Sequence, residues 1–177
     1  MFSFCTSTRK LLAILWQIKY YKKALSYHHT SSSPRPFAVF TFRYFLTRYP
    51  ELCLLAVPKT NATTKTRPEP IGCVVGKIDN EEEGYSLHGN GATFPTGYIG
   101  MLAVSKDYRR RGIGKALVQR VVHRMKKMGC RSVTLETEVS NVTAQRLYQE
   151  SFGFIREELL CRYYLNFGDA YRLRLWL

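Results

Sequence analysis

The stretch Met101-Leu-Ala-Val-Ser-Lys-Asp-Tyr-Arg-Arg-Arg-Gly-Ile-Gly-Lys-Ala116 decides the fold of this 177-residue chain. It starts as a short apolar strand, passes through a turn with three arginines and a Gly-x-Gly step, and enters a strongly helical sequence. The first turn of a helix carries unpaired backbone N–H groups and the positive end of the helix dipole. Glycines there let a large anion approach the backbone. The stretch therefore predicts a phosphate-binding turn with five candidates: Arg109, Arg110, Gly112, Gly114 and Lys115. For this segment alone, a solvated basic turn before a surface helix is the simpler alternative.

The sequence after the turn alternates between helical and strand patterns. Apolar residues recur at helical spacing over 113–125, basic residues occupy the other face, and Gly129 is predicted to end this helix. Residues 132–138 alternate as a half-buried strand does. Residues 141–150 predict a short helix capped by Ser140 or Asn141. A Gly-Phe pair then ends that helix and begins another strand.

This order of elements resembles the core of the GCN5-related N-acetyltransferase (GNAT) family, whose members use acetyl-coenzyme A. The shared features are the strand, the basic glycine turn, the Asn-led helix ending in Leu-Tyr, and the Gly-Phe that follows. The chain is most similar to the NatC type of N-terminal acetyltransferase, in four segments: Tyr98–Val104, Leu135–Val139, Arg162–Asn166 and Asp169–Leu177. The resemblance is close over residues 97–177 and continues more weakly through 35–57 and 71–78. It implies an α/β GNAT fold, with helices on both faces of a mixed central sheet that is splayed at the acetyl-coenzyme A site.

The resemblance also implies how the cofactor is held and the acetyl group transferred. The backbone of Leu102, Ala103 and Val104 would bond the pantetheine arm and polarise the thioester carbonyl, as an oxyanion hole does. Asn141 would hydrogen-bond the same arm, and a plain helix cap is the alternative for it. Tyr148 would protonate the leaving thiolate, whereas a packing role is its alternative. Glu136 would bind or deprotonate the substrate amine, and a solvated carboxylate is the alternative.

Substrate specificity is expected from three aromatic residues. The related enzymes act on proteins that begin with Met followed by a bulky apolar residue, which requires an apolar slot with a few polar groups. Phe37, Tyr163 and Tyr164 match the residues that form this slot, and ordinary cross-strand packing is the alternative for the two tyrosines. Arg35 stands where the family usually has an acidic residue, a change that would remove a carboxylate near the amino end of the substrate.

Charge and cysteine usage indicate which partners the chain can have. The net charge is +14, and the first fifty residues contain four Lys, four Arg and no acidic residue. Such a surface favours polyanions: coenzyme A, RNA or anionic lipid. The expected partners are nascent protein N-termini and NatC-type auxiliary scaffold subunits, with the ribosome as a further neighbour. No two of the five cysteines have metal-binding spacing, so we expect no metal and reduced thiols in the cytoplasm. No apolar stretch approaches the length of a membrane span, and we expect no membrane partner.

The chain is expected to consist of a basic extension, residues 1–33, followed by one GNAT domain, residues 34–177. Three interpretations of the extension stay open. It is a disordered or ill-fitting segment (a wrongly assigned gene start would give one), an organelle targeting signal, or a divergent first strand and helix of the fold. The domain is expected to open with the aromatic helix Phe37–Arg48 and the strands Glu51–Val57 and Ile71–Ile78.

Three functions compete. The leading hypothesis is NatC-type acetylation of protein N-termini. The second is acetylation of lysine or small amines by the same fold. The third is a non-catalytic, basic, ribosome-associated paralogue. The intact Arg-x-x-Gly-x-Gly turn and Tyr148 argue against the third hypothesis, because a pure binding protein needs neither.

Overall fold

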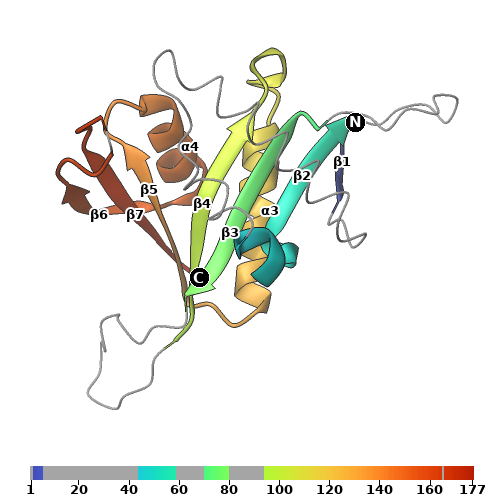
Figure 1. Cartoon of the computed structure of the whole chain (residues 1–177), viewed down its shortest axis with the longest axis horizontal. Helices are drawn as coiled ribbons and strands as arrows, with labels where there is room; N and C mark the ends of the chain where they lie inside the picture. The colour runs from blue at the N-terminus through green and yellow to red at the C-terminus, as the bar shows by residue number, and fades with distance from the viewer. Residues whose placement is uncertain (1, 6–43, 59–69, 80–93, 165) are drawn as a thin grey trace, which may run out of the picture. The chain divides into compact units, whose positions relative to one another are not determined.

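The computed structural model describes residues 2–5, 44–58, 70–79, 94–164 and 166–177. Its strands are β1 (Phe2–Cys5), β2 (Cys53–Pro58), β3 (Gly72–Asp79), β4 (Thr96–Val104), β5 (Ser132–Glu138), β6 (Ile155–Leu160) and β7 (Ala170–Trp176), and its longer helices are α3 (Ile113–Lys127) and α4 (Val142–Phe152). The strand order is β1-β2-β3-β4-β5-β7-β6 (Figure 1). Strands β4 and β5 pair in parallel, whereas β1–β2, β2–β3, β5–β7 and β7–β6 pair antiparallel. The mixed sheet expected from the sequence is therefore confirmed.

The chain divides into two compact units. The first comprises Met1–Gly76 and Met101–Val121, and the second comprises Lys77–Gly100 and Val122–Leu177. Strands β3 and β4 and helix α3 each contribute residues to both units.

The first unit packs the beginning of α3 against β3. Ile113, Leu117 and Val121 recur every four residues along the helix and are completely or almost completely buried. Gly72 of β3 makes this packing possible, because an added Cβ atom would lie 3.2 Å from the Ile113 side chain and 3.3 Å from that of Leu117. The first five residues of β3 are all buried, which confirms the prediction of a central strand that is apolar on both faces.

The second unit is built on β5, which begins and ends where the alternating pattern predicted. Val133 and Leu135 on one face are buried, and Leu173 of β7, paired with Leu135, is buried with them. On β4, Gly97 lies so close to α3 that an added Cβ atom would come within 2.5 Å of the sulfur of Met125. Met125 is itself completely buried, so a glycine is required there.

The ends of the helices also follow the sequence. Gly129 after α3 and Gly153 after α4 have φ angles of +90° and +77°, the left-handed conformation in which glycine ends a helix. Asn141 caps α4, because its Oδ1 accepts a hydrogen bond from the backbone N–H of Ala144 at 3.1 Å. The predicted cap and both predicted stops are confirmed.

Some elements differ from the expectation. Residues 2–5, where no alternating strand was recognised, form β1 and pair with β2, so the strand of the third interpretation is present. Glu51 was expected to begin a strand, but Pro50–Leu52 form a 3-10 turn and β2 begins at Cys53. Proline at the first position of that turn explains the difference, because its fixed φ suits a helical turn. Of the predicted helix Phe37–Arg48, residues 44–48 are helical and the rest lies outside the described residues, with Arg35.

Strand β6 is the last in the strand order and is mostly exposed. Its register with β7 shifts between Arg156 and Glu158, which marks a β-bulge at Glu157. A bulge of this kind bends and twists the strand that carries it.

Candidate functional site

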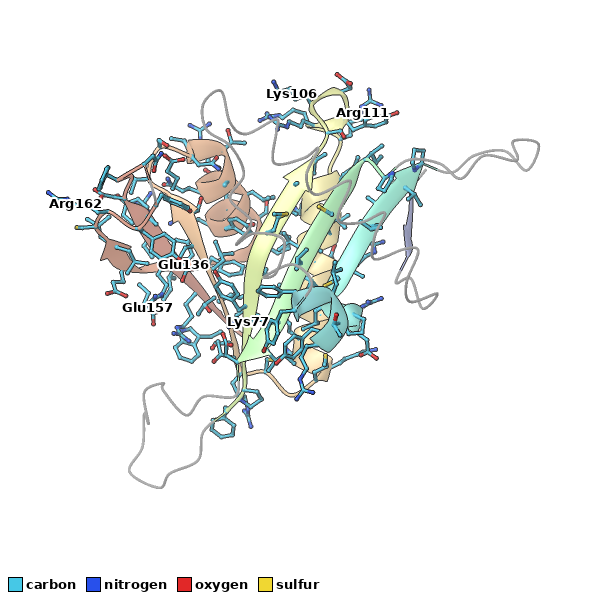
Figure 2. All side chains as sticks on the ribbon, in the orientation of Figure 1. Lys77, Lys106, Arg111, Glu136, Glu157 and Arg162 are labelled. Atoms are coloured by element: carbon cyan, nitrogen blue, oxygen red, sulfur yellow. The ribbon has the colours of Figure 1, made fainter. Side chains whose placement is uncertain are left out.

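The basic turn between β4 and α3 belongs to the first unit. Arg109 is tied to the end of β4, because its Nε donates a hydrogen bond to the Val104 carbonyl at 3.1 Å. The side chains of Arg109, Arg110 and Lys115 are exposed, and Figure 2 shows Lys106 and Arg111 on the same turn. Arg110 has a φ of +61° and Gly112 a φ of +76°. The turn therefore combines exposed cations with left-handed backbone conformations at Arg110 and Gly112.

The first turn of α3 can accept an anion. The Gly112 carbonyl accepts the first helical hydrogen bond, from Ala116 N–H at 2.9 Å, so the N–H groups of residues 113–115 have no partner within the helix. No acidic residue lies in this turn. A Cβ atom at Gly112 would meet nothing within 4 Å, which leaves the backbone open to a large ligand. The five predicted phosphate-binding residues therefore lie together and fit a diphosphate.

The adjoining strand carries the predicted pantetheine-binding residues. Leu102, Ala103 and Val104 are half-buried at the end of β4. The parallel ladder between β4 and β5 consists of Thr96, Gly97 and Tyr98 with their partners, so it ends well before Leu102. Backbone groups of β4 beyond that ladder are the ones that the family resemblance implies for holding the cofactor.

Glu136 occupies the centre of a polar cluster in the second unit (Figure 2). Its side chain is 9% exposed. The Tyr98 hydroxyl donates a hydrogen bond to Glu136 Oε2 at 2.7 Å, and Arg172 Nε donates to Oε1 at 3.2 Å. A solvated carboxylate, the alternative for Glu136, does not fit this burial. Burial first and the Glu136 charge second raise the pKa of Tyr98, so this hydroxyl remains a donor.

Tyr163 and Tyr164 lie beside this cluster, in the connection between β6 and β7. Their rings meet edge to face with centroids 5.2 Å apart. Burial, followed by the Glu136 charge, raises the pKa of Tyr163. Burial raises the pKa of Tyr164 to about 12, with smaller contributions from Tyr163, Glu138 and Glu136. The structure thus brings the two predicted substrate tyrosines near Glu136, whereas Phe37 lies outside the described residues.

Tyr148 of α4 is buried, and its ring packs edge to face on Phe154 with centroids 5.5 Å apart. Burial raises its pKa, so it is protonated at neutral pH. Among the described residues no hydrogen-bond partner for its hydroxyl is found, although buried hydroxyls are normally paired. The packing role is therefore real, and the hydroxyl is left with a proton to donate. Asn141 caps α4 through Oδ1, and that bond leaves its side-chain N–H groups available.

Sequence reasoning missed Tyr98 and Arg172. Arg172 lies directly opposite Glu136 on β7, and Tyr98 lies opposite Thr134, two residues before Glu136 on the same face of the sheet. The sequence signals were the polar residues that interrupt each apolar strand. That these residues bond Glu136 follows only from the register of β4, β5 and β7.

Residues 16–154 match the acetyltransferase (GNAT) family. The chain belongs to the GNAT family. It is 40% identical over 148 residues to N-alpha-acetyltransferase 30 of Xenopus laevis, covering 84% of this chain and 48% of that protein. It is 44% identical over 138 residues to N-alpha-acetyltransferase 30 of Saccharomyces cerevisiae, covering 78% of this chain and 71% of that protein. This GNAT chain spans about half the length of the Xenopus relative.

Solved GNAT structures agree in fold. A chain of the crystal structure of the NatC complex bound to Gag peptide and CoA superposes with a TM-score of 0.78 at 36% identity, covering 99% of this chain and 98% of that one. Arabidopsis thaliana NAA60 with a bisubstrate analogue gives a TM-score of 0.72 at 24% identity, covering 100% and 99% of the two chains, and supports the fold alone. Among the described residues of this GNAT chain, no group of His, Cys, Asp and Glu side chains is arranged to hold a metal. In the same part of the chain, no helix is long and apolar enough to cross a membrane.

Proposed function

We propose that this chain transfers an acetyl group from acetyl-coenzyme A to the N-terminal amine of proteins, as a NatC-type catalytic chain. The observation that supports this most is the buried Glu136, held by Tyr98 and Arg172 beside the tyrosine pair. The relatives named N-alpha-acetyltransferase 30 and the CoA-bound NatC structure support the same activity.

The residues of this chain divide the chemistry between them. Bound acetyl-coenzyme A would supply a thioester, which is an activated acetyl group. The first turn of α3 and Arg109 would hold its diphosphate, and the backbone of residues 102–104 would orient the thioester carbonyl. Glu136 would receive the substrate amine and accept its proton, directly or through water. Tyr148, protonated and without a described partner, would donate its proton to the sulfur that leaves.

An α-amine needs less help from a base than a lysine side chain does. The pKa of an α-amino group is about 7.7–8.0, so roughly a quarter of it is already neutral in the cell. A lysine side chain, with a pKa near 10.4, is only about a thousandth neutral. One carboxylate therefore suffices for protein N-termini, whereas lysine would need stronger help.

The slot for the first residues of the substrate is proposed to accept Met followed by a bulky apolar residue. Tyr163 and Tyr164 support this proposal, because their rings supply apolar walls and their hydroxyls can bind peptide carbonyls. Phe37 would complete the slot, and Arg35 would alter the charge near the amino end of the peptide.

The physiological setting is proposed on the same basis. The expected partners are nascent protein N-termini, the auxiliary subunits of a NatC-type complex and the ribosome, in the cytoplasm. Organelle targeting by the basic N-terminal segment is the alternative for localisation.

The test is acetylation of matched peptides by the full chain, alone and with NatC auxiliary subunits. We expect a peptide beginning Met-Leu to be acetylated faster than Met-Asp, by about tenfold to a hundredfold, because burial of a Leu side chain stabilises by about 1.5–3 kcal/mol. A peptide with a blocked N-terminus and a free lysine is the control. Preference for that control would support the second hypothesis, and binding of coenzyme A without any transfer would support the third.

A further inference from the structure

Three strands bring a carboxylate, a guanidinium and a second carboxylate into one line across the sheet. Glu136 on β5 is paired in register with Arg172 on β7, and Arg172 is paired with Glu158 on β6. Arg172 bonds both acids: its Nε reaches Glu136 Oε1 at 3.2 Å and its Nη1 reaches Glu158 Oε2 at 2.8 Å. The two acids differ in exposure, since the Glu136 side chain is 9% exposed and that of Glu158 is 51% exposed.

We propose that Arg172 is a positioning residue that fixes the orientation of the Glu136 carboxylate toward the substrate amine, and that Glu158 keeps Arg172 from neutralising it. This inference rests on the proposed function, because it assigns Arg172 a role through Glu136.

The geometry leaves Glu136 little freedom. Its two oxygens accept from side chains on neighbouring strands, Tyr98 at Oε2 and Arg172 at Oε1, and the Tyr163 hydroxyl also lies within hydrogen-bonding reach of this carboxylate. An ionised carboxylate has about four lone-pair positions, so Glu136 can still accept a hydrogen bond from an ammonium group or a water. With both ends held, the remaining positions point in fixed directions. Such a carboxylate is oriented before the substrate arrives, which is what efficient proton transfer requires.

The charge balance gives Glu158 its part. An arginine paired with Glu136 alone would cancel the charge that attracts a positive amine. With Glu158 on its other nitrogen, the two acids and one guanidinium have a formal net charge of one negative unit. The Arg172 guanidinium lies between the exposed Glu158 and the buried Glu136. We infer that Glu158 acts on Glu136 through Arg172.

A matched control lies two residues away on the same strand. Arg174 also bonds a glutamate of β6, with its Nε 2.7 Å from Glu157 Oε1, and its Nη1 donates to Ser132 Oγ at 2.9 Å. Its side chain is 12% exposed and therefore more buried than that of Arg172, at 36%. Loss of Arg174 should cost at least as much stability, but among the described residues its hydrogen bonds go to Glu157 and Ser132 and not to Glu136.

The experiment compares four variants in the full chain, with its auxiliary subunits, under saturating acetyl-coenzyme A. Arg172→Gln should lower kcat for a Met-Leu peptide by about tenfold or more, because a misplaced carboxylate loses part of the contribution of general base catalysis. Arg172→Lys should restore only part of it, since a point charge cannot hold two acids with a planar fork. Glu158→Gln should raise the KM for peptide about two- to fivefold with little change in kcat. Arg174→Gln should leave both constants unchanged.

The outcomes separate this inference from the function on which it rests. If the wild-type protein acetylates no peptide, the proposed function fails. If the wild type is active and Arg172→Gln behaves like Arg174→Gln, or loses thermal stability and activity in the same proportion, the positioning role is wrong. An increase in peptide affinity in Glu158→Gln would overturn the charge-balance part.

Discussion

Replacement of Tyr148 by Phe should move activity and stability in opposite directions. The ring keeps its edge-to-face contact with Phe154, and only a buried hydroxyl is lost. Because no described residue bonds this hydroxyl, its burial without a partner costs the wild-type fold about 1–3 kcal/mol. The Phe variant avoids this desolvation cost. A small void remains where the oxygen was and offsets part of this gain. The free energy of unfolding should therefore stay equal or rise by about 1 kcal/mol, whereas kcat should fall about a hundredfold or more.

The assays are urea unfolding without ligand and steady-state kinetics at saturating peptide and acetyl-coenzyme A. Coenzyme A affinity, measured by calorimetry, should change little, because the lost group acts on the leaving sulfur. Tyr171→Phe is the control. The Tyr171 ring makes a cation–π contact, with Arg156 Cζ 4.4 Å from its centroid, and has no proposed part in the reaction. A Tyr148→Phe protein that is clearly less stable but still turns over normally would show that the hydroxyl has a structural partner and no chemical role.

Three further changes test the phosphate-binding turn, the packing at Gly97 and the burial of Tyr164. Gly112→Glu should weaken coenzyme A binding at least about tenfold, through repulsion of the phosphates at a position with a φ of +76°, whereas Gly112→Asn, neutral and tolerant of that φ, should retain most of the affinity in calorimetry. Equal losses in the two variants would point to backbone strain alone. Gly97→Ala should destabilise the fold by about 1–3 kcal/mol in urea, because the new Cβ would lie 2.5 Å from the Met125 sulfur, and an unchanged midpoint would disprove that close packing. The pKa of Tyr164 is raised from 10.0 to about 12 by burial. Its neutral hydroxyl therefore contributes fully to the free energy of unfolding below pH 10, and this contribution is lost as pH rises through about 12. Stability measured across this window should fall less steeply in Tyr164→Phe than in the wild type, and parallel curves would argue against the burial of that hydroxyl.

Periodicity was enough to predict the long elements. The alternation of Ser132–Glu138 and the helical spacing after Gly112 each extend over several residues, so the pattern repeats before it ends. Strand β1 has four residues and shows no such repeat, and its pairing with β2 comes from contacts far along the chain. A pattern of that length cannot distinguish a strand from a loop.

The candidate site was predicted unevenly for a related reason. Glu136, Tyr148 and the glycine turn belong to local motifs, which can be recognised in a single stretch of sequence. Tyr98 and Arg172 reach Glu136 from neighbouring strands, and their sequence separations from it are 38 and 36 residues. No local motif specifies such a meeting, because it depends on strand order and register.

The bulge at Glu157 affects how strand β6 would meet other polypeptides. The last strand of a sheet presents unpaired backbone groups and can recruit any extended chain into a continuous ladder. In β6, three consecutive charged residues lie at the register shift: Arg156, Glu157 and Glu158. The twist of the bulge and these charges both oppose pairing with a strand from another chain. An enzyme proposed to act on unfolded N-terminal segments meets many extended chains that could pair with an exposed edge strand. The irregular border of its sheet would protect it against aggregation with its own substrates.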